Sequence, residues 1–115
     1  MEVRWLTFAR KQLGVVIQYV NDQFGANTAK HSLQSIMKSV NGLIKFPDSG
    51  VWDKKFSTEN ATIRHLNVGP NVVYYLVDLD EVVIIAVMHC RQSPNTVNRT
   101  ICYVLSSFNE ELYGN

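Results

Sequence analysis

Seven consecutive apolar residues, Val82–Met88, follow an acidic turn and precede polar residues and a proline. Five of the seven are Val or Ile, which pack well on a pleated surface and lose χ1 freedom in a helix. A run this short and continuous predicts a strand that is buried on both faces and central in its sheet. If the strand extends further, His89 and Arg91 point to the same side, because residues two apart share a face.

The first helical pattern lies between Ala9 and Phe24, where apolar residues recur every three or four positions. Thr7 is a candidate N-cap for this helix. Gly25 stands where a left-handed glycine commonly ends a helix. The pattern therefore predicts an amphipathic helix that packs on a core with one face.

A second helical stripe covers residues 29–44 and has the most regular apolar spacing in the chain. Asn27 or Thr28 is expected to cap it. Phe46-Pro47 should stop it, because the residue before a proline is pushed out of the α region. The short connection between the two helices predicts an antiparallel hairpin.

The second half of the chain is rich in strand signals. Two β-rich runs, Thr62–Val68 and Val72–Val77, are separated by the turn residues Gly69-Pro70-Asn71. Together with the buried run that follows them, they predict a three-stranded antiparallel meander. Val3–Phe8 predicts a further strand at the N-terminus. Residues 48–60 are either a loop or a distorted edge strand.

A third amphipathic pattern begins at Ser93-Pro94 and predicts a C-terminal helix, with a strand over 97–105 as the alternative. The predicted fold class is α+β, in which an antiparallel sheet (the N-terminal strand plus the meander) packs against the helical hairpin. Residues 1–115 are expected to form one domain, with a core at 1–92 and a helical extension at 93–115.

Composition limits the classes of function. The net charge is +1 and 46% of the residues are apolar, values that indicate a globular domain with little general attraction to nucleic acid or membrane. Cys90 and Cys102 make no disulfide framework and lack metal-ligand spacing. Charges at Glu2 and Arg4 argue against a signal peptide, and no run approaches the ~20 apolar residues of a membrane helix. We expect a cytoplasmic protein without cofactor, metal or membrane partner.

Several local patterns, in this order along residues 3–92, resemble one family. They are Val3-Arg4-Trp5…Ala9, the helical hairpin, Leu43…Phe46-Pro47…Gly50, Ile63-Arg64-His65-Leu66, Val72-Val73-Tyr74-Tyr75 and the last strand closing in His89-Cys90-Arg91. The ordered set resembles the RelE/ParE toxins of type II toxin–antitoxin (plasmid stabilisation) modules. The resemblance implies a cytoplasmic toxin that inhibits growth and is neutralised by a cognate antitoxin, which wraps it with a helix or an added strand.

The resemblance leaves the target open, because the fold does not choose between activities. RelE-like members cut ribosome-bound mRNA, and ParE-like members poison DNA gyrase. RNA cleavage needs proton-transfer groups and cations over the phosphate. The residues of suitable chemistry are His89, Arg91, Arg64 and Tyr75 as catalytic candidates, which could converge on one sheet, and Lys54 and Lys55 for binding the substrate or target. Each also has a structural interpretation, as a strand-end, turn-bound, core or solvated residue.

The net charge of +1 favours the ParE-like branch, because docking into ribosomal RNA gains affinity by neutralising phosphates. Enzymatic activity stays open, and no metal-dependent chemistry is expected. A non-toxic interaction module of the same fold is a third hypothesis. The apolar stripe of the C-terminal pattern must be buried on the sheet, in a homodimer or under the antitoxin. The predicted antitoxin-binding residues are Val97, Ile101, Val104, Leu105 and Phe108.

Overall fold

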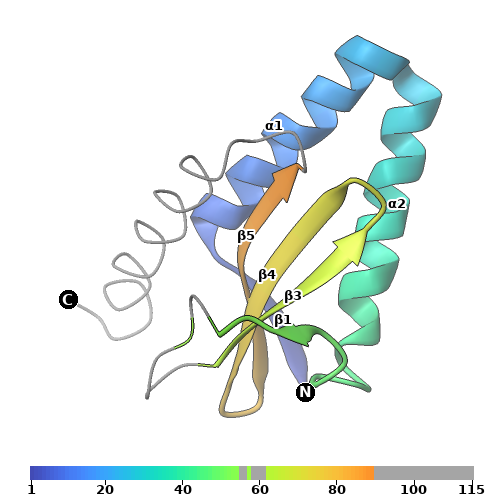
Figure 1. Cartoon of the computed structure of the whole chain (residues 1–115). Helices are drawn as coiled ribbons and strands as arrows, with labels where there is room; N and C mark the ends of the chain where they lie inside the picture. The colour runs from blue at the N-terminus through green and yellow to red at the C-terminus, as the bar shows by residue number, and fades with distance from the viewer. Residues whose placement is uncertain (55–56, 58–61, 90–115) are drawn as a thin grey trace.

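The computed structural model describes residues 1–54, 57 and 62–89, and all structural statements below refer to these residues. Two helices lie against one side of a five-stranded sheet, an α+β fold (Figure 1). The elements are β1 (Glu2–Trp5), α1 (Thr7–Phe24), α2 (Ala26–Gly42), β2 (Val51–Trp52), β3 (Ile63–Val68), β4 (Asn71–Asp78) and β5 (Glu81–His89). The predicted C-terminal helix lies outside the described residues.

The sheet has the strand order β1-β5-β4-β3-β2. Strands β3, β4 and β5 pair antiparallel, which confirms the predicted three-stranded meander. β2 pairs antiparallel with β3, so residues 51–52 take the edge-strand alternative. The prediction of a purely antiparallel sheet is wrong, because β1 pairs parallel with β5, from Glu2 opposite Glu81 to Trp5 opposite Ile84. The helical hairpin follows β1 and carries the chain to the other edge of the sheet, where residues 51–52 form the short edge strand β2.

Strand β5 carries the buried run. Val82–Met88 are each at most 1% exposed, as predicted for a strand with a neighbour on each side. The pairing with β4 shifts between Tyr74 and Tyr75, whose partners are Ala86 and Ile84. Ile85 is therefore an extra residue, a β-bulge that bends the strand.

The starts of both helices differ from prediction. Thr7 is the first helical residue of α1, and the N-cap is Leu6, which makes no side-chain cap. Leu6 is placed by the sheet instead, because its N–H donates to the Ile84 carbonyl at 3.1 Å. Gly25, with φ +94°, ends α1 and caps α2, so the Asn27 or Thr28 cap is also wrong. One glycine in a positive-φ conformation thus forms the whole connection.

Helix α1 also closes the edge of β5 beyond the end of β1. Gln12 Oε1 accepts a hydrogen bond from the Val87 N–H at 3.0 Å, and Gln12 Nε2 lies 3.6 Å from Met88 Sδ. Buried backbone donors need a partner, and here a side chain supplies what a longer β1 would. The signal in the sequence is a glutamine on the apolar face of α1, one turn before the buried Val16.

Candidate functional site

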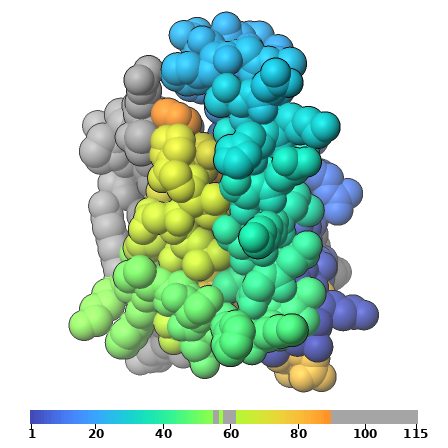
Figure 2. All heavy atoms as spheres, turned by 90° about the vertical axis from the view of Figure 1, so that its right-hand side faces the viewer, coloured from blue at the N-terminus to red at the C-terminus, as the bar shows by residue number. Residues whose placement is uncertain are grey.

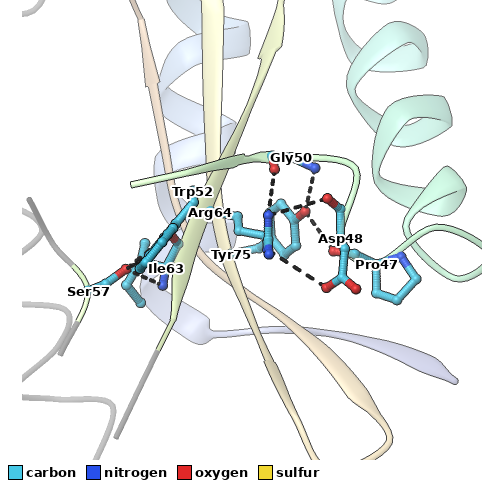
Figure 3. A network of polar contacts seen from close by, with 8 residues as sticks. All are labelled: Pro47, Asp48, Gly50, Trp52, Ser57, Ile63, Arg64 and Tyr75. Atoms are coloured by element: carbon cyan, nitrogen blue, oxygen red, sulfur yellow. Dashed lines mark hydrogen bonds and ion pairs between the residues drawn. The ribbon is translucent and has the colours of Figure 1, made fainter. Parts of the chain in front are cut away.

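Arg64 on β3 and Tyr75 on β4 are direct partners across the antiparallel ladder. Both side chains reach the loop that joins α2 to β2 (Figure 3). We call residues 47–50 the α2–β2 loop. Two of the predicted catalytic residues are thus brought together. Their hydrogen-bond partners show whether they are free for catalysis or hold the loop.

The Tyr75 side chain is fully buried, and its hydroxyl makes two hydrogen bonds to the α2–β2 loop. The hydroxyl accepts from the Gly50 N–H at 2.8 Å and donates to the Pro47 carbonyl at 2.8 Å. Burial raises the pKa of Tyr75 above its ordinary value of 10.0, although the Gly50 N–H and Arg64 oppose this rise. The hydroxyl is therefore neutral at physiological pH and fully used in holding the loop.

The contact requires glycine at position 50. A Cβ there would lie 2.5 Å from Tyr75 Oη and 2.6 Å from the ring atom Cε1. Such a contact is far inside the van der Waals separation of about 3.5 Å. The tyrosine and the glycine therefore act as one unit.

Arg64 holds the same loop from the neighbouring strand β3. Its Nη1 donates to the Gly50 carbonyl at 3.0 Å and to the Asp48 carbonyl at 3.3 Å, and its Nε lies 3.8 Å from Asp48 Oδ1. The Asp48 side chain is 84% exposed, so water screens the ion pair and it contributes little. The bonds to the two backbone carbonyls are the stronger part of this contact.

A second polar cluster fixes β2 to β3 through Ser57 (Figure 3). The Ser57 hydroxyl accepts from the Trp52 indole N–H at 3.1 Å and from the Ile63 N–H at 2.8 Å. It donates to the Asp53 carbonyl at 2.7 Å. Lys54, a predicted target-binding residue, places its Nζ 5.2 Å from the centre of the Trp52 ring, within the range of a cation–π contact.

His65 and Tyr74 are cross-strand partners. They lie on the other face of the sheet, because side chains alternate along a strand and their neighbours Arg64 and Tyr75 face the loop. Their ring centroids are 5.8 Å apart. Asp53 Oδ2 lies 3.4 Å from His65 Nδ1, an ion-pair distance without hydrogen-bond alignment. The pKa of Tyr74 is raised by burial and, secondly, by the Asp53 carboxylate. Sequence reasoning did not single out this cluster.

His89 is at the far end of the sheet from Arg64 and Tyr75. Its cross-strand partner is Asn71, and its ring meets Tyr19 of α1 edge-on at 5.3 Å. Tyr75 lies four positions after Asn71 on β4, about 13 Å at ~3.3 Å per residue. The predicted convergence of His89 with Arg64 and Tyr75 is therefore wrong. Strands β3 and β5 run in the same direction, so the start of one and the end of the other lie at opposite ends.

The remaining predicted site residues lie outside the described residues. They are Arg91, Lys55, Val97, Ile101, Val104, Leu105 and Phe108. Within the described part of the chain, no group of three or more His, Cys, Asp or Glu side chains is placed to hold a metal ion. Neither α1 nor α2 combines the length and apolar character needed to cross a membrane.

Comparison with known proteins agrees with this architecture. A family model, "ParE toxin of type II toxin-antitoxin system, parDE", matches residues 3–94. No curated protein matches the chain. A solved structure described as the chromosomal ParDE TA system from P. aeruginosa is 19% identical, covers 77% of this chain and 95% of that chain, and has a TM-score of 0.64, a likeness in fold. Because the family match spans most of the 115 residues, the chain belongs to the ParE toxin family of type II toxin–antitoxin systems.

Proposed function

We propose that this toxin inhibits growth by binding a protein target, DNA gyrase, and not by cutting RNA. The observation that carries the proposal is that the Arg64 and Tyr75 side chains both bind the backbone of the α2–β2 loop. The Arg64 guanidinium donates to backbone carbonyls of the α2–β2 loop, and the buried Tyr75 hydroxyl is spent on the same loop. The Tyr75 hydroxyl is thus already engaged as donor and acceptor, and Arg64 is already bound to the loop through Nη1 and Nε.

The geometry of the described residues is unfavourable for RNA cleavage in a second way. Transfer of the 2′-hydroxyl proton and stabilisation of the phosphorane charge require a base, an acid and a cation within a few ångströms. His89 lies about 13 Å along the sheet from Arg64 and Tyr75. With a net charge of +1, the chain also lacks the positive excess that favours docking into ribosomal RNA.

Ribosome-dependent mRNA cleavage is the alternative, and one observation favours it. His89 is only partly buried at the end of β5, and Arg91 follows two positions later. An imidazole next to a guanidinium suits proton transfer at a phosphate. A third hypothesis, a non-toxic interaction module of the same fold, is separated from both by a growth assay.

The deciding experiment induces the full chain in bacteria and follows growth, the DNA damage response and mRNA integrity by toeprinting. The proposal expects growth arrest with DNA damage, intact mRNA and inhibition of purified gyrase. The variant His89→Ala should keep this activity. Cleavage of translated mRNA that disappears in His89→Ala would establish the RNA-cleaving alternative, and unimpaired growth with the wild-type chain would leave the interaction module.

We further propose that the cognate antitoxin binds the apolar stripe of the C-terminal segment, in competition with the sheet or a second copy of the chain. The proposed contact residues are Val97, Ile101, Val104, Leu105 and Phe108. An apolar stripe at helical spacing needs a cover. Deletion of residues 95–115 should therefore alter antitoxin affinity, measured by calorimetry with the product of the neighbouring reading frame; unchanged affinity would remove the stripe from the interface.

A further inference from the structure

The two faces of the sheet differ in what covers them. Helices α1 and α2 both lie against one face (Figure 1). That face carries Tyr75, which reaches the loop after α2, and His89, which contacts α1. Side chains alternate along a strand and cross-strand partners share a face, so Tyr74, Leu76 and Val83 lie on the opposite side. We call that side the second face.

The second face is buried although the described helices lie against the other one. Six of its apolar side chains are at most 9% exposed: Ile63, Tyr74, Leu76, Val83, Ala86 and Met88. From α1, Gln12 reaches this set only at the edge of β5, where its Nε2 lies 3.6 Å from Met88 Sδ. The side chains are buried within a single chain. Their cover therefore belongs to the same chain and is neither a second copy nor a partner.

The burial is graded across the second face and shows where the cover lies. In one cross-strand row, the His65 side chain is 23% exposed, Tyr74 9% and Ala86 0%. At the two ends of the next row, Asn67 on β3 is exposed and Met88 on β5 is 1% exposed. Figure 2 shows yellow residues of β3 at the surface beside α2. The cover therefore lies along β4 and β5 and leaves the outer part of β3 open.

The segment that follows β5 has the length and the starting point to be this cover. Residues 90–115 provide 26 residues directly after His89, at the end of the most deeply buried strand. The other stretches outside the described residues, 55–56 and 58–61, lie between β2 and β3, on the open side of the gradient. A helix over residues 97–112 would span about 24 Å at ~1.5 Å per residue. Strand β5 spans about 30 Å at ~3.3 Å per residue, so a helix that turns back after β5 covers most of it.

The sequence of that segment has the chemistry that the second face requires. Its apolar stripe is Val97, Ile101, Val104, Leu105 and Phe108, and the positions between are mostly polar. An amphipathic helix buries its apolar face against another element of the domain. The centre of the second face, at Leu76, Val83 and Ala86, is apolar and presents no charge that the stripe would leave unpaired.

We infer that residues 93–115 pack as a helix on the second face of the sheet, with the apolar stripe over Leu76, Val83 and Ala86. The sheet then lies between two helical layers, and the toxin has a second core. The inference does not depend on the target of the toxin. It adds a condition to the proposed antitoxin contact, because the antitoxin reaches the stripe only after the segment has left the sheet.

The test measures how fast a buried cysteine reacts with a thiol reagent in the full chain. The native thiols are first removed by Cys90→Ser and Cys102→Ser. Val83→Cys then reports on the second face. Val73→Cys is the matched probe on the helix-covered face, because Val73 lies two positions from Tyr75 and is equally buried, at 0% against 1% for Val83. Both probes should react slowly in this background.

A charge placed in the stripe should then open one face and leave the other closed. Leu105→Glu should accelerate the reaction of Val83→Cys by about 100-fold or more, because an unpaired carboxylate is costly to bury, and should leave Val73→Cys slow. Ser106→Glu is the control, since at 100° per residue a helix puts position 106 on the side opposite the stripe. It should leave both probes slow.

Unchanged reactivity of Val83→Cys in the Leu105→Glu chain would overturn the inference, and so would an equal acceleration by Ser106→Glu. If Leu105→Glu exposes both probes equally, the chain has unfolded, and the milder Leu105→Ala decides. Acceleration confined to Val83→Cys then supports the inference, and its absence or an equal acceleration of both probes overturns it. The antitoxin contact is tested separately, by affinity after deletion of residues 95–115, so either proposal can fail alone.

Discussion

The β5 core and the α2–β2 loop are two regions of the molecule that are stabilised by different kinds of interaction. The core is held by apolar contact, with Val82–Met88 at most 1% exposed. The loop is held by a tyrosine hydroxyl and a guanidinium that bond to its backbone. Apolar contact is non-directional and tolerates many sequences. Hydrogen bonds to a fixed backbone tolerate few, because a buried donor without its partner is costly.

The difference matters for function, because the two regions present different surfaces. The side chains of Val82–Met88 in β5 are buried and offer no surface to a partner. The α2–β2 loop is held by the buried Tyr75 hydroxyl and by Arg64, and it connects the exposed Phe46 to β2, where Ser57 orients the exposed Trp52 ring. Residues that look catalytic in the sequence, Arg64 and Tyr75, are therefore best understood as supports for a neighbouring surface.

The largest expected effect is in the core. Ile84→Ala removes a fully buried side chain and should lower the free energy of unfolding by about 2–5 kcal/mol. Val15→Ala is the control, because Val15 is 70% exposed on α1 and should change stability by less than about 0.5 kcal/mol. Both values come from urea unfolding followed by circular dichroism. Equal effects at the two positions would show that β5 is not the core.

The next effect tests the tyrosine–glycine unit. Tyr75→Phe leaves the Gly50 N–H and the Pro47 carbonyl unpaired and should cost about 1–3 kcal/mol. Gly50→Ala should also destabilise, because its Cβ would lie 2.5 Å from the Tyr75 hydroxyl oxygen. The two changes should be less than additive in a double-mutant cycle, since part of the clash disappears with the hydroxyl.

Gly14→Ala is the matched control for that cycle. Gly14 lies inside α1, and a Cβ there would meet nothing within 4 Å. Alanine is favoured over glycine in a helix by up to about 1 kcal/mol, so this variant should be more stable than the wild type. A glycine-to-alanine change that stabilises at position 14 and destabilises at position 50 separates helix propensity from the contact. Additive effects of Tyr75→Phe and Gly50→Ala would contradict the unit.

The core could be predicted from the sequence, because burial depends on local composition. Five β-branched residues in seven predict β5 whatever the rest of the chain does. The hairpin followed from the three-and-four spacing of its apolar residues. Its helix starts did not, because Leu6 is fixed by Ile84 of a distant strand and Gly25 turns the chain alone.

The roles of Arg64, Tyr75 and Gln12 could not be predicted in the same way. Their partners are backbone atoms far away in the sequence, in the α2–β2 loop and in β5. Such atoms are the same in every residue and leave no pattern of side chains to recognise. The position of His89 was accessible from the sequence, however, since the first and third strands of a meander run in the same direction. That rule alone puts His89, at the end of the third strand, far from Arg64, at the start of the first.

A pH titration sharpens the contrast between apolar and polar support. Burial raises the pKa values of Tyr74 and Tyr75 above 10.0. Well below pH 10 both tyrosines are neutral in the folded and unfolded chains, so their contribution to stability is constant. Above pH 10 the unfolded chain ionises first, and stability should fall by at most about 1.4 kcal/mol per pH unit for each tyrosine. Tyr75→Phe should reduce this slope in urea unfolding between pH 8 and 11; an unchanged slope would assign it to other groups.

The smallest expected effect separates the two kinds of contact that Arg64 makes. Arg64→Met removes the bonds to the Gly50 and Asp48 carbonyls and should cost about 1–2 kcal/mol. Asp48→Asn removes only the ion pair at 3.8 Å, whose carboxylate side is 84% exposed, and should cost less than about 0.5 kcal/mol. The comparison is made by urea unfolding at low and high salt, where Asp48→Asn should lose its small effect and Arg64→Met should keep most of its own. A larger loss in Asp48→Asn would mean that charge, and not the shape of the α2–β2 loop, is what Arg64 recognises. The loop would then be expected to loosen in high salt, because screening weakens an exposed ion pair.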